Sequence, residues 1–302
     1  MQNRYESSGG AFTAKHRSTT YDFISPLQFD LSGKHVLVTG TAWESGVGFA
    51  TATAFARAGA SIIAVVDLHP VPADLISKLK SVALATGRPE PTVLTSGVDI
   101  AKPESVQAMY ESLSQGLKGR LDILVNNAAH MEPYESFLDS DPEVFWRTWE
   151  VNIHGLINMA RIFLPLQLAS HASAGGLCTM INLASSGALS VRPGSSAYRT
   201  SKLAVLRWTE ALQTEYADQG LLAYCVNPGA IKTEITKTAP DSVRNRFPDQ
   251  PDVAGDTIVW LGADRKEWLG GRYISCVWDM EEVMQKKDEI VSEDKLKLKM
   301  TF

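Results

Sequence analysis

Tyr198, Lys202 and Ser185 are the residues whose types and spacing are best suited to chemistry. Tyr198 precedes Lys202 by four positions in the run Ser-Ser-Ala-Tyr-Arg-Thr-Ser-Lys, and Ser185 lies thirteen positions before Tyr198. Residues four apart share one face of a helix, so the Lys202 ammonium can lie beside the Tyr198 hydroxyl. A phenol has an ordinary pKa of about 10, and a neighbouring cation lowers that pKa toward neutral pH. The spacing therefore predicts proton exchange with an alcohol or ketone oxygen that Ser185 also contacts.

A chance tyrosine and lysine on an amphipathic helix would give the same four-residue spacing, so the rest of the chain must decide between the two interpretations. Ser186 is a second candidate for the serine, but the thirteen-residue spacing to Tyr198 favours Ser185.

Short apolar strands alternate with helices from Lys34 onward. Strands that are apolar throughout are typical of a parallel sheet covered on both faces. We therefore predict an α/β fold: one doubly wound Rossmann-type domain over residues 31–280, with a seven-stranded parallel sheet and helices on both faces. An N-terminal extension (1–30, with 1–20 mobile) precedes it and a helical tail (281–302) follows. The predicted strands are 35–40, 61–67, 92–95, 121–125, 177–183, 221–226 and 272–277, and the predicted helices include 47–58, 73–86 and 142–169.

The composition excludes several classes of function. The chain has 302 residues, a net charge of −5 and no basic block, so we expect no nucleic-acid partner. Its apolar runs are too short to cross a bilayer, so we expect no membrane partner. The three cysteines are widely spaced in apolar runs, and the histidines form no metal-binding pattern. Residues 1–30 lack the apolar core of a signal peptide and the C-terminus is not a peroxisomal signal, which predicts a cytoplasmic protein without a metal.

A glycine-rich turn follows the first strand. Gly40, Gly46, Val47 and Gly48 surround the start of a helix of small residues. Glycines allow a tight turn and let a pyrophosphate approach the helix N-terminus, where free N–H groups and the helix dipole favour an anion. Gly48 also permits close packing of the helix against the strand. In the first strand-to-helix turn of an alternating chain, this pattern predicts a dinucleotide site.

Asp67 ends the second strand, 27 residues after Gly40. A carboxylate there accepts both hydroxyls of an adenosine ribose and repels a 2′-phosphate. Neither Arg nor Lys occurs between Gly40 and Gly48 or directly after Asp67. The sequence therefore favours NAD, with NADP as the alternative; a simple turn residue at the strand end is the other interpretation of Asp67.

Together these motifs resemble the short-chain dehydrogenase/reductase family over roughly residues 30–280. The resemblance implies that Asp99 and Ile100 flank the adenine, that Asn126 and Ala128 line the cofactor, and that Asn152 holds a water in a proton relay from Lys202. It also implies that Tyr198 and Lys202 contact the cofactor. The segment that would bracket the nicotinamide contains Pro228, Gly229, Ile231 and Thr233.

The chain departs from the family pattern at two places. The glycine turn carries two more residues between Gly40 and Gly46, including Trp43 and Glu44, and a carboxylate so near the phosphates must point away. The Asn-Asn-Ala-Gly run ends in Ala129 instead of glycine. The N-terminal extension and the C-terminal sequence resemble dehydrogenases of fungal type, many of them from secondary metabolism.

By analogy with the family, the substrate pocket lies over the carboxyl ends of the strands. Its apolar content predicts a medium-sized hydrophobic or aromatic alcohol or ketone, and His130 and Arg192 are the only cationic candidates for a polar substrate group. The residues expected to line it are His130, Met131, Tyr134, Ala188, Leu189, Val191 and 234–247.

These observations predict an oxidoreductase that transfers a hydride between nicotinamide and a secondary alcohol or ketone, with Asn152, Ser185, Tyr198 and Lys202 as its catalytic residues. Two other functions stay open: a non-redox isomerase, dehydratase or cyclase on the same fold, and a nucleotide-binding regulatory protein. Apolar residues on helix 142–169 and on the Tyr198 helix exceed what one sheet face needs, which predicts a homotetramer or homodimer.

Overall fold

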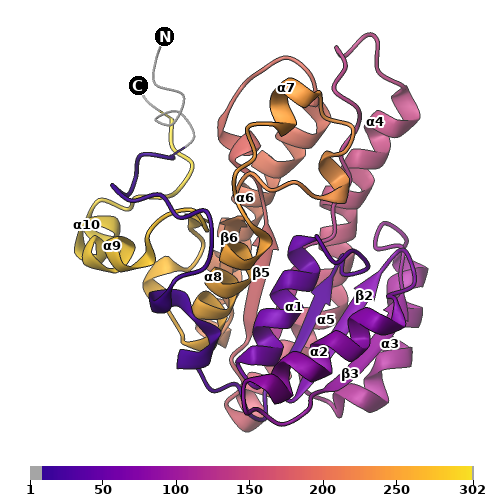
Figure 1. Cartoon of the computed structure of the whole chain (residues 1–302), viewed down its shortest axis with the longest axis vertical. Coiled ribbons are helices and arrows are strands. Elements are labelled where there is room, and N and C mark those ends of the chain that lie inside the picture. Colours follow the sequence, from indigo (N-terminus) through magenta and orange to yellow (C-terminus); the bar gives the residue numbers. More distant parts are fainter. Residues whose placement is uncertain (1–8, 301–302) are drawn as a thin grey trace.

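Seven strands form one parallel sheet in the order β3-β2-β1-β4-β5-β6-β7 in the computed structural model, which describes residues 9–300 (Figure 1). This confirms the predicted fold class. The chain moves outward from β1 to β3 and then returns to place β4 beside β1, so that a crevice opens where the order reverses. The strands are β1 (His35–Thr39), β2 (Ile62–Asp67), β3 (Thr92–Gly97), β4 (Ile123–Asn126), β5 (Thr179–Leu183), β6 (Leu222–Asn227) and β7 (Tyr273–Ser275).

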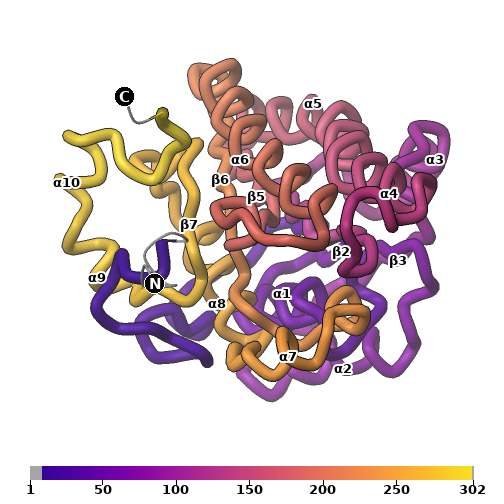
Figure 2. The backbone as a smooth tube through the Cα atoms, turned by 90° about the horizontal axis from the view of Figure 1, so that it is seen from above, coloured from indigo at the N-terminus to yellow at the C-terminus, as the bar shows by residue number. Residues whose placement is uncertain are grey.

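Helices cover both faces of the sheet, with α1, α2 and α8 on one side and α3, α5 and α6 on the other (Figure 2). Alternate strand residues enter the two cores: Val36 and Val38 lie in one, and Leu37 lies in the other. The helices are α1 (Val47–Arg57), α2 (Ala73–Ala85), α3 (Pro103–Leu117), α4 (Pro142–Trp149), α5 (Leu156–Ala174), α6 (Ser196–Tyr216), α7 (Asp241–Arg244), α8 (Pro251–Ala263), α9 (Met280–Gln285) and α10 (Lys287–Ser292). Short 3-10 turns occupy 22–24, 26–28, 186–189, 217–219, 234–236 and 267–269.

The predicted continuous helix 142–169 is wrong in its middle and at its end. A π-helical turn at Glu150–Gly155 separates α4 from α5, which continues to Ala174. π-turns are rare and occur often at functional sites. This one carries Asn152, whose side chain bonds the backbone of the loop after β4.

Helix α8 is an element that the sequence analysis did not place. It begins with Pro251 at its first position, a favourable place for proline, and most of its residues are buried. Helix α8 packs against α1 and so completes one face of the sheet. Apolar residues around the whole helix hid the one-sided pattern that marks a surface helix.

Residues 9–20, which we expected to be mobile, lie against the C-terminal segment (Figure 1). Trp278 Nε1 donates to the carbonyl of Gly9 at 2.8 Å, and Arg17 forms an ion pair with buried Asp279 at 2.6 Å. The rest of the predicted mobile stretch, residues 1–8, is outside the described residues. Within residues 9–300, no helix is both long and apolar enough to cross a membrane.

Candidate active site

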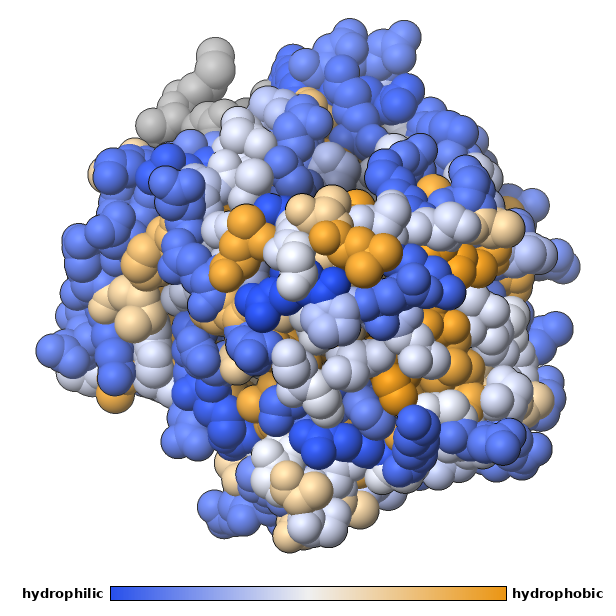
Figure 3. All heavy atoms as spheres, turned by 60° about the horizontal axis from the view of Figure 1, so that its bottom comes forward, coloured by the Kyte–Doolittle hydropathy of each residue, from blue (hydrophilic) through white to orange (hydrophobic). Residues whose placement is uncertain are grey.

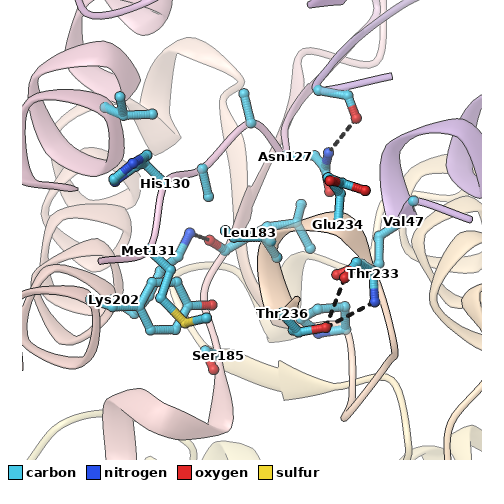
Figure 4. Close-up of a pocket in the computed structure, with 18 of the residues that line it drawn as sticks. Val47, Asn127, His130, Met131, Leu183, Ser185, Lys202, Thr233, Glu234 and Thr236 are labelled. Atoms are coloured by element: carbon cyan, nitrogen blue, oxygen red, sulfur yellow. Dashed lines mark hydrogen bonds between the residues drawn. The ribbon is translucent and has the colours of Figure 1, made fainter. Parts of the chain in front are cut away.

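A cavity of about 630 Å³ lies over the carboxyl ends of the strands, where the strand order reverses. Its volume is within the usual range for small-molecule sites. Figure 4 shows side chains from several separate segments converging on it. The described residues contain no cluster of His, Cys, Asp and Glu suited to a metal. Most of the predicted site residues line this cavity: Gly40, Gly46, Val47, Asp67, Asp99, Ile100, Ala128, Ser185, Tyr198, Lys202, Pro228, Gly229, Ile231 and Thr233.

The glycine turn brings two backbone segments closer together than side chains allow. A Cβ on Gly48 would lie 2.1 Å from the carbonyl oxygen of Gly40, and a Cβ on Gly40 would lie 2.7 Å from Asn127 Nδ2. Gly40 also has φ +75°. Gly48 does not line the cavity, so its role is the close packing of α1. Helix α1 starts at Val47 beside the cavity and leaves its first N–H groups free for an anion.

The extra residues of the glycine turn form one rim of the cavity. Trp43 lines it and stands edge-on to His69, with ring centroids 6.0 Å apart. Glu44 forms an exposed ion pair with Lys78. The Glu44 carboxylate is therefore held outside the cavity, as the interpretation of this turn as a phosphate site requires.

Asp67 is buried at the end of β2 and fixed by backbone donors. Its two carboxylate oxygens accept from the N–H groups of Ala42 (2.9 Å) and His69 (3.0 Å). Each carboxylate oxygen can accept a further hydrogen bond. Asp67 is therefore both a residue that orders the turn and an acceptor presented to the cavity.

Asp99 is held by Arg147, which the sequence analysis did not select. The guanidinium of Arg147 donates to Asp99 Oδ1 at 2.8 Å, pairs with Glu150 and lines the same cavity. Arg147 comes from α4, which is distant in sequence from Asp99, so spacing alone gave no signal for this pair.

The prediction that Asn126 lines the cofactor site is wrong, because Asn127 takes that place. Asn126 ends β4, and its side chain donates to Asn182 on the neighbouring strand at 2.8 Å, away from the cavity. Asn127 lines the cavity and donates through Nδ2 to the carbonyls of Thr39 (2.8 Å) and Gly40 (3.0 Å). Successive strand residues point to opposite faces, so an error of one residue exchanges the two roles.

Ser185 and Tyr198 are brought together as the sequence predicts. Their side chains share a hydrogen bond. The Ser185 Oγ also accepts from the N–H of Gly187 at 3.0 Å, which fixes the serine at the end of β5. Both residues line the cavity, so a substrate oxygen placed there can contact the two hydroxyls.

Lys202 is buried and points to the end of β5. Its Nζ donates to the carbonyl of Leu183 at 2.7 Å (Figure 4). The same Nζ lies 5.7 Å from the centre of the Tyr198 ring. Burial lowers the pKa of Lys202 from 10.5 to about 8. This direction follows from the cost of removing an ammonium from water.

We expected Lys202 to lower the pKa of Tyr198 below its ordinary value of 10.0, and this expectation is wrong for the protein chain alone. Burial raises the pKa of Tyr198 to about 12, while the hydrogen bond with Ser185 and the charge of Arg199 act in the opposite direction. The ammonium of Lys202 is directed to the Leu183 carbonyl. Desolvation of the phenolate therefore dominates, and the phenol is protonated at neutral pH.

Asn152 supports the site from outside the cavity. Its side chain accepts from the N–H of His130 (2.8 Å) and donates to the His130 carbonyl (2.9 Å) and to Ser201 Oγ (3.0 Å). The side chain thus joins the loop after β4 to α6. The proton relay through Asn152 stays a prediction.

Comparisons with known proteins agree with this geometry. A family model described as short chain dehydrogenase matches residues 34–243. The chain is 40% identical over 296 residues to the short chain dehydrogenase mpl6 of Monascus purpureus, covering 98% of each chain. It is 35% identical to the short chain dehydrogenase andI of Emericella variicolor, covering 90% of this chain and 91% of that protein. This chain belongs to the short-chain dehydrogenase family.

Solved structures resemble the dehydrogenase over most of its length. A 3-ketoacyl-(acyl-carrier-protein) reductase from Brucella melitensis, complexed with NADH, has a TM-score of 0.68 and 29% identity, covering 82% of this chain and 97% of that one. An L-sorbose reductase from Gluconobacter frateurii, complexed with NADPH and L-sorbose, has a TM-score of 0.66 and 26% identity, covering 82% and 95%. The glycine cradle, the free N–H groups of α1 and the Asp67 carboxylate fit a nicotinamide dinucleotide.

Glu132 is a further residue of the dehydrogenase that the sequence analysis missed. Both its carboxylate oxygens accept from the N–H of Tyr198 at 3.1 Å, and the hydroxyl of Thr148 donates to it at 3.0 Å. Ser195, at the N-cap of α6, makes no side-chain cap hydrogen bond. Buried Glu132 therefore supplies the acceptor at the start of α6 and fixes the backbone of Tyr198.

The segment after β6 lines the same cavity as Ser185, Tyr198 and Lys202. Gly229 has φ +111°, and the N–H of Ala230 donates to buried Asp249 at 2.6 Å. Thr233 and Thr236 form a reciprocal cap of the short turn at 234–236 (Figure 4). These contacts order the backbone that the family resemblance assigns to the nicotinamide.

Part of the predicted substrate pocket is wrong. Ala188 and Leu189 pack against the core, and Val191 is fully exposed, so none of the three lines the cavity. Ala188 and Leu189 belong to a 3-10 turn at 186–189 that the sequence analysis did not predict, and Val191 follows it. His130, Met131 and Tyr134 line the cavity as predicted, with Glu234, Ile235, Thr236, Thr238, Val243 and Phe247. Arg199, the residue after Tyr198, also lines the cavity and was not among the cationic candidates.

Proposed function

We propose that this dehydrogenase interconverts a secondary alcohol and a ketone, exchanging the oxygen-bound proton while bound nicotinamide supplies or accepts the hydride at carbon. The single observation that carries this proposal is the convergence of Ser185, Tyr198 and Lys202 on one cavity that also contains the glycine cradle. The fold provides placement, which is a large part of catalysis for such a reaction.

Each residue has one role in this proposal. Ser185 holds the substrate oxygen beside the Tyr198 hydroxyl. Tyr198 gives or takes the proton, and its raised pKa keeps it protonated at neutral pH, which suits ketone reduction. Lys202 holds a positive charge near the phenol, and Asn152 steadies α6 through Ser201.

NAD is the cofactor that we propose, with NADP as the alternative. Asp67 presents its carboxylate to the cavity, where a 2′-phosphate would be repelled. The nearby cation Arg147 is paired with both Asp99 and Glu150, which leaves it poorly placed to neutralise such a phosphate.

The experiment is a panel of medium-sized aryl and alkyl ketones assayed with NADH and with NADPH at 340 nm, with product identified by mass spectrometry. We expect ketone-dependent oxidation of NADH and slower oxidation of NADPH. Ser185→Ala should lose most of the rate, whereas Ser186→Ala, the matched control on the neighbouring serine, should keep it. Substrate conversion without any change in absorbance would instead support an isomerase, dehydratase or cyclase.

The substrate that we propose is a medium-sized hydrophobic or aromatic metabolite. Met131, Ile235 and Phe247 give the outer part of the cavity apolar walls. The resemblance to fungal relatives from Monascus and Emericella is consistent with a role in secondary metabolism. The three cysteines of the chain are buried free thiols, which agrees with a cytoplasmic location.

A homodimer or homotetramer is also part of the proposal. Helix α4 packs against α6, and the two helices lie on the same side of the sheet (Figure 2). They expose Trp146 (61% of its surface) and Leu203 (37%). Of the apolar residues on the two helices that predicted the oligomer, Leu156, Leu206 and Leu212 are buried in the monomer. On the face drawn in Figure 3, the hydrophobic residues form small groups among hydrophilic ones. Light scattering at micromolar concentration should give a multiple of 32.9 kDa, and a monomer mass would contradict the proposal.

A further inference from the structure

Two arginines at the substrate end of the cavity have no carboxylate partner within residues 9–300. Arg192 and Arg199 both line the cavity, and the ion pairs found within residues 9–300 include neither of them. Arg147, at the cofactor end, is by contrast paired with two carboxylates. Glu234, an acidic residue of the substrate end, is paired with Lys237. The substrate end therefore carries positive charge that the described residues do not balance by direct pairing.

Arg199 lies beside the catalytic hydroxyls. A Cβ built on Gly187 would be 3.7 Å from Arg199 Nη1 and 3.2 Å from Ser185 Oγ, so the guanidinium and the serine flank the same glycine. The charge of Arg199 also lowers the pKa of Tyr198 against the effect of burial. A group bound by Arg199 would thus be attached close to the reacting carbon.

The guanidinium is oriented but only partly satisfied. Nη1 donates to the hydroxyl (3.0 Å) and the carbonyl (3.4 Å) of Ser190, and Nε is buried without a hydrogen-bond partner among the described residues. Nη2 makes no hydrogen bond to the described residues and is not buried, so it is the donor that a ligand in the cavity can reach. A partly buried cation with unmade hydrogen bonds costs free energy unless a ligand completes them. The planar fork of arginine matches the two oxygens of a carboxylate.

We propose that Arg199, with Arg192 at the exposed mouth, binds a carboxylate of the substrate, so that this dehydrogenase acts on keto acids or hydroxy acids. The proposal rests on the proposed function and names its substrate class. The apolar residues Met131, Tyr134 and Phe247 then contact the carbon skeleton, and the carboxylate lies a few bonds from the carbonyl that Ser185 and Tyr198 contact.

Equilibrium binding tests this subsite without requiring turnover. Calorimetry on the full chain saturated with NADH would compare 4-phenylbutanoate with 4-phenylbutanamide, which share a skeleton and differ in charge. We expect the carboxylate to bind roughly 10- to 100-fold more tightly, the range for hydrogen bonds to a charged group. Equal affinities for the two ligands would overturn the proposal, whatever the reaction of the enzyme.

Arginine variants test which residue causes the preference for the carboxylate ligand. Arg199→Met keeps most of the length of the side chain but should abolish the preference for the carboxylate, and Arg192→Met should reduce it a few-fold. Arg161→Met, on the exposed face of α5 and outside the cavity, is the matched control and should retain the full preference. An Arg199→Met protein with normal NADH affinity and an unchanged carboxylate preference would overturn the assignment. If that variant fails to fold, the same comparison in Arg199→Lys decides, because losing the planar fork should still weaken carboxylate binding.

Turnover separates failure of this inference from failure of the proposed function. An aryl keto acid and its methyl ester would be compared as substrates with NADH. We expect the acid to have the lower KM in wild type and a KM similar to that of the ester in Arg199→Met. Equal KM values for the acid and the ester in wild type would overturn only the carboxylate subsite. Carboxylate-selective binding without reduction of either compound would support the subsite and count against the proposed reaction.

Discussion

The two ends of the cavity are built in different ways. The cofactor end is made largely of backbone held at fixed distances: the glycine cradle, the start of α1 and a buried Asp67 bonded to two N–H groups. The substrate end is made of side chains from the segments at 130–134, 186–199 and 234–247, with Arg192 and Arg199 free of ion pairs to the described residues. Substitutions at the cofactor end would displace backbone that belongs to the core of the fold. Substitutions in the loops of the substrate end can change which ligand binds without disturbing the sheet. Ser185, Tyr198 and Lys202 lie where the two ends meet.

The largest effect is expected at this meeting point. Tyr198→Phe removes the hydroxyl but retains the ring, so folding and cofactor affinity should survive while turnover falls by about 10²–10⁴-fold. Steady-state rates and NADH titration measure the two properties separately. Tyr110→Phe, on α3 and outside the cavity, is the control. A Tyr198→Phe protein with more than about a tenth of the wild-type rate would mean that another group supplies the proton.

Gly48→Ala tests whether the cofactor end depends on backbone approach. The new Cβ would lie 2.1 Å from the Gly40 carbonyl oxygen, so either α1 or the turn must move. We expect a loss of about 3 kcal/mol or more in the free energy of unfolding, at the upper end for overpacking, together with weaker cofactor binding. Chemical denaturation measures the loss. Gly97→Ala, where a Cβ meets nothing within 4 Å, should change stability little; equal losses in both variants would contradict the close-packing argument.

Lys202→Met should remove activity and yet stabilise the protein at neutral pH. Burial lowers the folded-state pKa of Lys202 from 10.5 to about 8, so the unfolded chain binds more protons between these values. Above pH 10.5 the lysine is neutral in both states and its burial costs no stability. As the pH falls from 10.5 to about 8, the unfolded chain takes up the proton first, and the free energy of unfolding decreases. The difference corresponds to roughly 3 kcal/mol at most, less the lost bond to the Leu183 carbonyl.

Unfolding curves of wild type and Lys202→Met between pH 7 and 10.5 measure this effect. The stability gain of the variant should be largest below pH 8 and disappear toward pH 10.5. A stability gain that does not change with pH, or a variant that is less stable than wild type at pH 7, would show that burial of the Lys202 ammonium does not destabilise the protein.

Asp67→Ala gives the smallest of these effects and tests the side-chain part of the cofactor end. Loss of a charged acceptor should weaken NAD binding by about 1.5–3 kcal/mol, with a smaller change for NADP. Fluorescence titration measures both affinities. Asp74→Ala, an exposed residue in the first turn of α2, is the control. Tighter binding of NADPH than NADH by the wild type would contradict the assignment of Asp67.

Some of the site follows directly from spacing. Tyr198 and Lys202 lie on one helix, Ser185 ends a strand, and the glycine turn precedes a helix. Local periodicity and turn chemistry determine such features, because they depend on neighbours a few residues away. The sequence analysis was wrong where a shift of one residue reverses the direction of a side chain. Asn126, at the end of β4, bonds Asn182 on β5, whereas the next residue, Asn127, lines the cavity.

The sequence by itself determined the fold class, the family and the candidate trio of Ser185, Tyr198 and Lys202, since strand alternation and motif order are local properties. Only the tertiary structure decided the environments of these groups. It directed the Lys202 ammonium to the Leu183 carbonyl, placed Glu132 under the Tyr198 backbone and left Arg199 without a carboxylate partner among the described residues. These outcomes depend on contacts between segments far apart in the chain and on the burial of charges, and neither can be read from spacing along one strand or helix.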